Sequence, residues 1–269
     1  MSKSTQRTLS LEQDLRAAVR AGDITPHFQP IVGVASGEIV GVEALARWFR
    51  PDGPVPPDVF ISLAESLGLI GELGRRILAD ALDALAGWRR AGLPMTFVAV
   101  NVSPLQLRDP DFVVTVSELL ASRGLAPAAL VVEITEGAVM EASPAVATAL
   151  AELRSLGVGL SMDDFGTGYS SLARLGQLPV TEIKVDRSFI AELPGDDTMT
   201  RIVLELAVRF GLHTVAEGVE DAAQLEALHR LGCDTAQGYH LYRPLPPEDV
   251  PALFGGDARL ATSVTTART

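Results

Sequence analysis

The sequence predicts an α/β fold, an irregular (β/α)8 barrel of the TIM type with an antiparallel first strand. Helical and strand-like segments alternate over most of the 269 residues, and an eight-stranded barrel occupies roughly 250 residues. The apolar content of 47% is enough to bury one large core without a second domain. The first two strand-like runs follow each other too closely for a helical crossover, which makes the barrel irregular.

The chain opens with a polar segment and two strands. Residues 1–10 are predicted to be disordered, and an amphipathic helix is predicted from about Leu11 to Ala21. The run PHFQPIVGVASGEIVGVEALARW then holds two strand-like stretches around a turn at residues 35–37. A turn of this length joins antiparallel strands, so the first strand is expected to oppose the second.

Helices and strands then alternate as far as Phe254. DPDFVVTVSELLASRG precedes LVVEIT, PAVATALAELRSLG precedes VGLSMDD, MTRIVLELAVRFG precedes HTVAEG, and DAAQLEALHRLG precedes CDTAQG. We therefore place one barrel domain over residues 11–254. The Gly-, Thr- and Ala-rich residues 255–269 are predicted to be a disordered tail.

Composition excludes several classes of partner and environment. The net charge of −12 and the pI near 4.8 argue against DNA, because binding the phosphate backbone requires clustered Lys and Arg. The lone Cys233 excludes an internal disulfide framework and is interpreted as a buried, inert thiol. No secretory signal and no membrane-spanning apolar stretch is recognisable, so we expect a cytoplasmic protein without membrane insertion.

Polar side chains stand at the ends of seven short apolar runs. The runs read GVEALAR, FVAVNVS, LVVEITE, LSMDDFG, TEIKVD, HTVAEGVE and CDTAQGY, and their polar residues are Glu43, Asn101, Glu133, Asp163, Asp164, Lys184, Glu217 and Gln237. Strand side chains alternate between faces, which puts Glu43 and Arg47 on one face. Active sites of such barrels lie at the C-terminal strand ends, so these groups are expected to converge.

The residue types indicate the chemistry. Carboxylate and amide oxygens favour hard cations such as Mg²⁺ or Mn²⁺ over Zn²⁺ or copper. Adjacent Asp163 and Asp164 suit two ions that share a ligand, an arrangement used in phosphoryl displacement. His27, His213, His229 and His240 have no shared spacing and are interpreted as packing or surface residues.

Seven ordered motifs carry a family resemblance. EALARW, NVSPLQL, EITE, DDFGTGYSSL, KVDRSF, AEGVE and QGYHLYRP, spread over residues 11–254, resemble the EAL-domain family of cyclic di-GMP phosphodiesterases. The resemblance implies metal-dependent hydrolysis of cyclic di-GMP to linear pGpG, in an irregular barrel that often forms a homodimer. Position 46 holds Ala where the family has a larger aliphatic residue, and this change removes no donor.

The resemblance also implies a role for each site residue. One ion would be bound by Glu43, Asn101, Glu133 and Asp163, and a second by Asp163, Asp164 and Glu217. Lys184 would position the attacking water, within a catalytic set of Glu43, Asp164, Lys184 and Glu217. Gln29, Arg47 and Gln237 would face the substrate, and Gln237 would also complete the metal and water network. Glu136 would anchor the loop that runs from Phe165 through Ser171.

Other readings remain open at the level of sequence. Asp163 and Asp164 before Phe-Gly-Thr-Gly also suit a turn or helix cap, and Lys184 alone suits a solvated strand end. A catalytically silent cyclic di-GMP receptor and a protein-interaction scaffold compete with the enzyme, although no metal ligand is missing. A Mg²⁺ barrel enzyme acting on a carbonyl or enol substrate is a further alternative. A regulatory partner or a sensory domain supplied by another chain is compatible with all of these.

Overall fold

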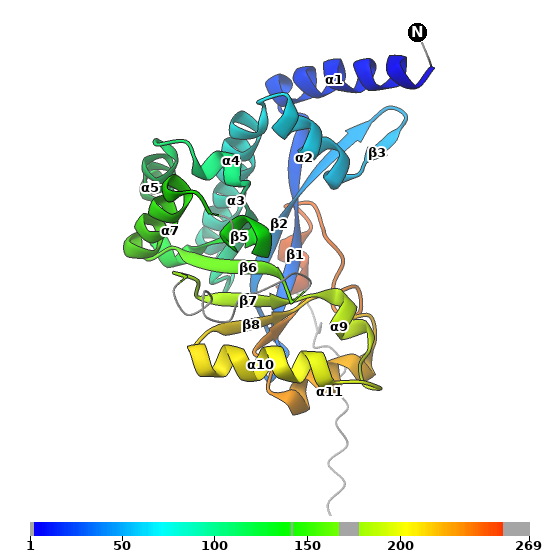
Figure 1. Ribbon diagram of the computed structural model, residues 1–269, viewed down its shortest axis with the longest axis vertical. Helices are drawn as coiled ribbons and strands as arrows, with labels where there is room; N and C mark the ends of the chain where they lie inside the picture. The colour runs from blue at the N-terminus through cyan, green and yellow to red at the C-terminus, as the bar shows by residue number, and fades with distance from the viewer. Residues whose placement is uncertain (1–2, 141, 167–177, 255–269) are drawn as a thin grey trace, which may run out of the picture.

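Strand β1 (Ile24–Gly33) closes an eight-stranded barrel by running antiparallel to both of its neighbours. The computed structural model describes residues 3–140, 142–166 and 178–254. In it β1 pairs with β2 (Ile39–Arg50) on one side and β9 (Thr235–Ala236) on the other. The other barrel strands pair in parallel in the order β9-β8-β7-β6-β5-β4-β2. The predicted irregular TIM-type barrel with an antiparallel first strand is confirmed (Figure 1).

The remaining strands follow the predicted apolar runs. They are β3 (Gly53–Val55), β4 (Phe97–Asn101), β5 (Leu130–Thr135), β6 (Gly159–Phe165), β7 (Glu182–Val185) and β8 (His213–Ala216). β3 lies outside the barrel and extends β2 as a hairpin. A tight turn joins β1 to β2, in which the Gly37 N–H donates to the Gly33 carbonyl at 2.8 Å and Gly37 adopts a left-handed φ of 68°. This connection sets the register that places Gln29 opposite Glu43.

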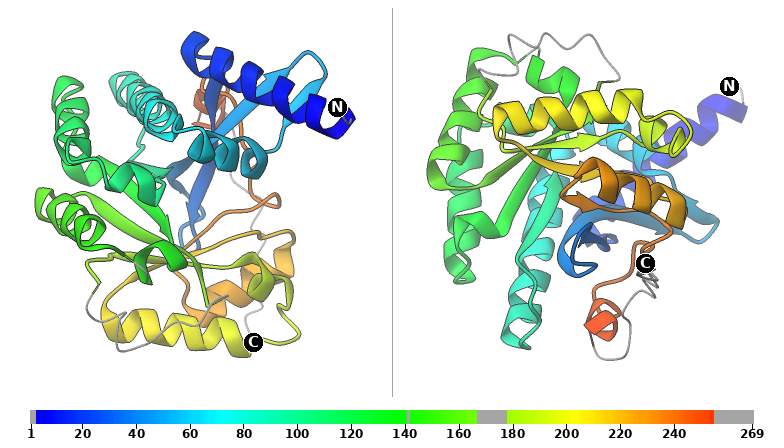
Figure 2. Two further views of the ribbon diagram at one scale, coloured as in Figure 1. Left: turned by 45° about the horizontal axis from the view of Figure 1, so that its top comes forward. Right: turned by 90° about the horizontal axis from the view of Figure 1, so that it is seen from below.

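Helices surround the barrel, as both views of Figure 2 show. The longer ones are α1 (Lys3–Ala21), α2 (Pro57–Ser66), α3 (Ile70–Arg90), α5 (Phe112–Ser122), α7 (Pro144–Leu156), α10 (Thr198–Phe210) and α11 (Ala222–Leu231). Short turns of helix complete the fold: α4 (Pro104–Leu107), α6 (Glu136–Met140), α9 (Arg187–Ala191), η1 (Pro127–Ala129) and η2 (Val250–Phe254). Gly157, Gly211 and Gly232 end α7, α10 and α11 in left-handed conformation, as helix C-caps do.

The first helix is longer than its sequence pattern indicated. We expected disorder up to residue 10 and a helix from Leu11, but α1 begins at Lys3. Apolar periodicity becomes visible only where the helix is packed, and over the part of α1 whose burial is described, residues 9–21, the buried residues are Leu15, Ala18 and Val19. No Gly or Pro interrupts the polar first turns, so the helix continues into them without an apolar stripe. The tail predicted for residues 255–269 lies outside the described residues.

The mouth of the barrel is the end that holds the predicted site residues Glu43, Asn101, Glu133, Asp163, Asp164, Lys184, Glu217 and Gln237. An apolar plug of buried side chains fills the barrel below this mouth. Ile31, Ala99, Val131 and Val215 form a buried cluster inside the barrel, with Val40 and Phe97 packed against it. The Phe97 ring occupies the space beside Gly41, where a Cβ atom would come within 2.6 Å of the ring. The barrel interior around these side chains is therefore apolar, and the predicted site residues lie beyond it, toward the C-terminal strand ends.

Gly238→Ala should destabilise the barrel at the end of β9. A Cβ atom at Gly238 would lie 2.2 Å from both the N and the O of Val219, whose backbone bonds to the Gln237 carbonyl and the His240 N–H. We expect a loss of roughly 1–3 kcal/mol in the free energy of unfolding, the usual range for overpacking. Urea titration followed by circular dichroism measures it.

Gly87→Ala is the matched control. Gly87 lies within α3, and a Cβ atom there would meet nothing within 4 Å. Alanine should stabilise that helix by roughly 0.5–1 kcal/mol. Equal unfolding free energies for the two variants would show that close approach at Gly238 does not constrain the fold.

Candidate active site

A buried lysine lies at the centre of the acidic mouth. The Nζ atom of Lys184 is 2.6 Å from Glu217 Oε1, 3.1 Å from Glu133 Oε2, 3.3 Å from Glu43 Oε2 and 3.7 Å from Asp163 Oδ1. Its side chain is 1% exposed. Four carboxylates from four different segments of the chain thus surround one ammonium group. Its single positive charge cannot balance four ionised carboxylates.

The side-chain amides of Asn101 and Gln237 bridge pairs of the same carboxylates. Asn101 donates from Nδ2 to Glu43 Oε1 at 2.8 Å and to Glu133 Oε2 at 3.1 Å. Gln237 donates from Nε2 to Glu43 Oε2 at 2.7 Å and to Glu217 Oε1 at 3.0 Å. Every oxygen of Glu43 therefore accepts a charged or amide donor, which fixes its orientation.

The shifted pKa values of Lys184 and of the surrounding carboxylates reflect their burial and the excess of negative charge around them. Burial opposes the ammonium form of Lys184, but the surrounding carboxylates outweigh it and raise its pKa well above the ordinary value. Burial and the neighbouring Glu43 raise the pKa of Glu133 well above its usual range, and burial raises the pKa of Glu217 to about 7. Burial also disfavours ionised Glu43, yet Lys184 and the hydrogen bond from Gln237 leave its pKa lowered. The mouth as a whole therefore attracts further positive charge.

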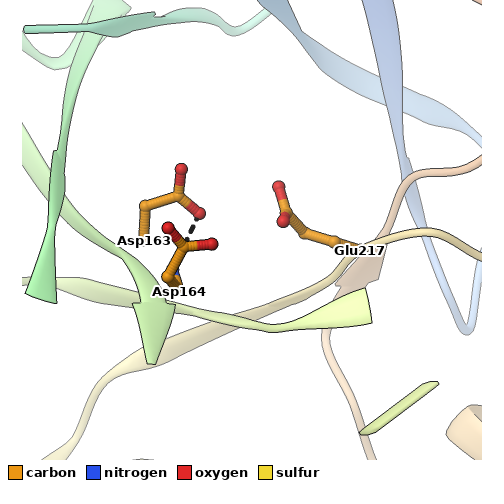
Figure 3. A group of neighbouring side chains, drawn as sticks. All are labelled: Asp163, Asp164 and Glu217. Carbon is orange, nitrogen blue, oxygen red and sulfur yellow. Dashed lines mark hydrogen bonds between the residues drawn. The ribbon is translucent and has the colours of Figure 1, made fainter. Parts of the chain in front are cut away.

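Asp163, Asp164 and Glu217 form a second carboxylate group, which shares Asp163 and Glu217 with the network around Lys184 (Figure 3). One oxygen from each lies within 4.8 Å of the other two. The Asp164 N–H donates to Asp163 Oδ1 at 3.0 Å, and Asp164 has a φ of 58°, a left-handed conformation unusual for a residue other than glycine. Burial, then the charge of Asp163, raises the pKa of Asp164. The turned backbone brings two consecutive aspartates to the same side of β6, against the usual alternation of a strand.

The donor set fits hard divalent cations. Its ligand atoms are carboxylate and amide oxygens, which Mg²⁺ and Mn²⁺ prefer. Among the described residues, the buried Oε1 of Gln237 has no hydrogen-bond partner, so an amide whose NH₂ group contacts Glu43 and Glu217 also carries an unpaired acceptor. Asn101 turns its NH₂ group toward the carboxylates, and rotation of that amide would present its oxygen instead.

The expected substrate-contacting residues flank the carboxylates. Gln29 is buried opposite Glu43 in the register of β1 and β2 and donates to the Tyr242 carbonyl at 3.1 Å. Arg47 is partly exposed on β2 and donates to the Ala46 carbonyl at 3.0 Å. Desolvation lowers the pKa of Arg47, while Tyr239 and Glu43 oppose that shift. Arg47 thus presents a cation at the rim of the acidic mouth.

Glu136 connects α6 to the end of β6. It is the first residue of α6 and is 5% exposed, and its Oε2 accepts a hydrogen bond from the Gly166 N–H at 3.0 Å. Gly166 has a left-handed φ of 93° and directly follows Asp163, Asp164 and Phe165. Residues 167–171 of the loop expected to be anchored by Glu136 lie outside the described residues.

The structure corrects one detail of the predicted strand ends. Glu43 was expected at the end of its strand, but β2 continues to Arg50. The longer strand is possible because β1 and β3 supply antiparallel partners beyond the barrel rim. Glu43 still meets Asn101, and the predicted mouth includes every expected polar residue from β2 through β9.

Further polar residues lie near this network but were not among the predicted site residues. Glu65 of α2 accepts a hydrogen bond from the Ser103 hydroxyl at 2.6 Å, just beyond Asn101. Glu182 and Ser161 are buried opposite each other on β7 and β6, below Lys184. Glu182 was visible in TEIKVD as a polar residue two positions before Lys184, and strand alternation would have assigned both to one face.

The histidines and the cysteine lie apart from this network. His213 is 3.5 Å from Asp234 and 3.3 Å from the Thr235 hydroxyl, at the opposite end of β8 from Glu217. The His27 ring packs against Phe49 in a tilted arrangement, with 5.6 Å between the ring centroids. Cys233 is buried, and burial raises the pKa of its thiol to about 11, which makes it a poor nucleophile at neutral pH.

A family model for the EAL domain matches residues 12–244. This chain belongs to the EAL domain family. It is 41% identical over 256 residues to the bifunctional diguanylate cyclase/cyclic di-GMP phosphodiesterase MucR of Pseudomonas aeruginosa, and 42% identical over 248 residues to the cyclic di-GMP phosphodiesterase NbdA of the same species. These alignments cover 94% and 91% of this chain but 37% and 32% of the relatives. The EAL domain therefore spans about a third of the curated relatives it matches.

Solved structures agree with this assignment. A structure of the PaMucR phosphodiesterase in complex with c-di-GMP is 41% identical, with a TM-score of 0.84, and the match covers 90% of this chain and 99% of that one. The EAL enzyme Bd1971 in a form with cAMP and cyclic di-GMP is 30% identical, with a TM-score of 0.87, and the match covers 94% and 70% of the two chains. None of the helices in the described part of this EAL domain combines the length and apolarity needed to cross a membrane.

Lys184→Met should make folding of the EAL domain depend on divalent metal. Methionine keeps the volume of the side chain but leaves buried Glu43 and Glu133, and partly buried Glu217, without the ammonium. Removal of one partner from a buried charge network costs roughly 3–5 kcal/mol. We expect a lower melting temperature in EDTA, and a larger rise on addition of Mg²⁺ or Mn²⁺ than for the wild type.

Arg230→Met is the control for loss of a cation. Arg230 forms an exposed ion pair with Glu226 at 3.2 Å, and such pairs contribute roughly 0–1 kcal/mol. Indistinguishable melting of the two variants in EDTA would show that the Lys184 ammonium does not stabilise the mouth.

Proposed function

We propose that this EAL domain is a metal-dependent phosphodiesterase that hydrolyses cyclic di-GMP to linear pGpG. The observation that carries the proposal is the complete oxygen-donor set around Lys184 and Asp163, joined to Arg47 at the rim. The relatives named as cyclic di-GMP phosphodiesterases support the same substrate. Hydrolysis adds water to one phosphorus atom, breaks its bond to the ribose 3′ oxygen, and leaves the proton from water on that oxygen.

Two Mg²⁺ or Mn²⁺ ions would be held by the residues of the mouth. One set comprises Glu43, Asn101, Glu133 and Asp163; the other comprises Asp163, Asp164 and Glu217. When bound, such ions supply a water of lowered pKa and offset the charge that develops on the phosphate. No histidine is required as a base, which agrees with the positions of His27 and His213 away from the network.

The chain's own residues orient the reactants. Lys184, held among four carboxylates at the centre of the mouth, positions the attacking water. Arg47 binds a phosphate oxygen, and Gln29 contacts a guanine edge from the neighbouring strand. Gln237 holds Glu43 and Glu217 together, so it preserves the spacing of the two ligand sets. This network holds the ligands and donors in place before substrate binds. Such preorganisation is usually the largest contribution to an enzyme's rate enhancement.

Chromatography of purified protein with cyclic di-GMP and Mg²⁺ or Mn²⁺ tests the proposal. We expect pGpG to form, and excess EDTA to stop its formation because the all-oxygen site supplies no substitute for the ion. Full activity in EDTA would rule out the metal mechanism. Binding of cyclic di-GMP without hydrolysis would identify a receptor, and absence of both would favour an interaction scaffold.

Glu43→Ala and Arg47→Ala should separate chemistry from binding. Loss of Glu43 removes a metal ligand that is also tied to Lys184, Asn101 and Gln237, so we expect turnover to fall by at least about 100-fold. Loss of Arg47 removes a charged hydrogen bond to phosphate and should weaken affinity by roughly 1–3 kcal/mol. Calorimetry and steady-state kinetics distinguish the two; equal affinity and equal loss of rate would contradict this division.

Glu136→Ala should slow cleavage with little change in binding. The variant removes the acceptor of the Gly166 N–H, so the turn after Asp163 and Asp164 loses its tether. Misplacement on the order of 1 Å can reduce a rate by about 100-fold. Cyclic di-GMP affinity by calorimetry should stay within a modest factor, with a normal circular dichroism spectrum. Turnover near that of the wild type would mean that other contacts hold the turn.

A further inference from the structure

The segment after β4 is held from outside the barrel. Asn101 ends β4, and the Val102 N–H donates to the Glu133 carbonyl at 2.9 Å. Ser103 then caps α4: its hydroxyl accepts from the Leu105 N–H at 3.2 Å, while its own N–H donates to Gln106 Oε1 at 3.1 Å. The chain leaving Asn101 is thus bent sharply into α4 within two residues.

One acidic side chain reaches this bend from α2. Glu65 Oε1 accepts the hydrogen bond of the Ser103 hydroxyl at 2.6 Å. A hydroxyl bonded to a carboxylate at this distance is a short, charge-assisted contact, roughly twice as strong as a neutral one. Since the hydroxyl proton is directed to Glu65, the Ser103 oxygen keeps its lone pairs for the Leu105 N–H. The cap of α4 and the tether to α2 therefore use the same atom.

A second contact fixes the other end of α4. The Gln106 side chain is 5% exposed and lies against Gly74 of α3, where a Cβ atom would come within 2.0 Å of Gln106 Nε2. α4 is therefore packed closely against α3 at this glycine. With α4 held by α3, the Glu65 contact controls the bend itself, and hence the direction in which Asn101 leaves β4.

We propose that Glu65 is a positioning residue for Asn101, acting through the hydroxyl of Ser103. The proposal rests on the proposed metal-dependent function of the mouth. Asn101 lies two residues from Ser103 and bridges Glu43 and Glu133, so a shift of the bend would displace the amide relative to both carboxylates. Glu65 touches neither ion nor substrate. Its contribution is to keep the Asn101 amide at the distance that a small cation requires.

The first measurement is the affinity of the protein for Mn²⁺ in the absence of substrate, determined from the electron paramagnetic resonance signal of the free ion. Loss of a partner that orients a metal ligand typically weakens metal affinity by about 10–100-fold, and we expect this for Glu65→Ala. Glu65→Gln keeps an acceptor for the hydroxyl and should recover part of the loss. Glu118→Ala, an exposed glutamate on α5, is the matched control and should bind Mn²⁺ as the wild type does.

Variants of Ser103 separate positioning from helix capping. Ser103→Thr keeps the hydroxyl and a good N-cap, so it should bind Mn²⁺ nearly as the wild type does. Ser103→Ala loses the hydroxyl and should resemble Glu65→Ala. Because both residues act through one hydrogen bond, the double variant Glu65→Ala, Ser103→Ala should bind Mn²⁺ no more weakly than Ser103→Ala alone. Melting temperatures in EDTA report any general loss of stability.

The outcomes distinguish this proposal from the proposed function. Mn²⁺ binding that is weaker in the Glu65 and Ser103 variants, and no weaker in the double variant, would support the positioning role. If the wild-type protein also formed no pGpG, the positioning role would stand and the proposed enzymatic function would be overturned. Unchanged Mn²⁺ affinity in Glu65→Ala, or losses that add fully in the double variant, would overturn the positioning role whether or not pGpG forms. A fall in melting temperature without a change in Mn²⁺ affinity would likewise assign Glu65 to stability alone.

Discussion

The buried ammonium of Lys184 is the interaction on which the mouth of this barrel depends. Glu43, Glu133, Asp163 and Glu217 come from different strands, and close packing of carboxylates in a poorly solvated space is unfavourable without a counter-charge. Lys184 supplies one positive charge from β7, near the centre of the group. That charge allows the strands to converge, yet it leaves an excess of acid that favours a divalent cation.

The barrel makes this concentration of charge possible by separating it from the apolar core. The plug of Ile31, Ala99, Val131 and Val215 closes the interior below the carboxylates. Helices cover the outside of the strands, so the polar groups have one direction in which to meet solvent (Figure 2). The desolvation that raises the pKa of Glu217 to about 7 is therefore a consequence of architecture as well as of neighbouring charge.

Contacts outside the mouth set the positions of its ligands. Glu136 holds the turn after Asp163 and Asp164 through the Gly166 N–H, and Glu65 holds the bend after Asn101 through Ser103. In both cases a carboxylate on a helix bonds to the segment that leaves a barrel strand. The common arrangement ties ligand geometry to helix packing, so that the strands need not fix each side chain by themselves.

The sequence by itself determined the barrel, the antiparallel first strand and the types of donor at its mouth. Strand alternation, short connections and carboxylates after apolar runs are local signals, and the barrel topology brings such strand ends to one side. Only the tertiary structure decided that Lys184 lies among four carboxylates, and that β2 continues beyond Glu43, because these features depend on partners remote in the chain. The Glu65–Ser103 contact also joins segments separated in sequence, which periodicity cannot reveal. Helix α1 extends to Lys3 for a related reason: its first turns have no apolar stripe, so no local pattern marks where it begins.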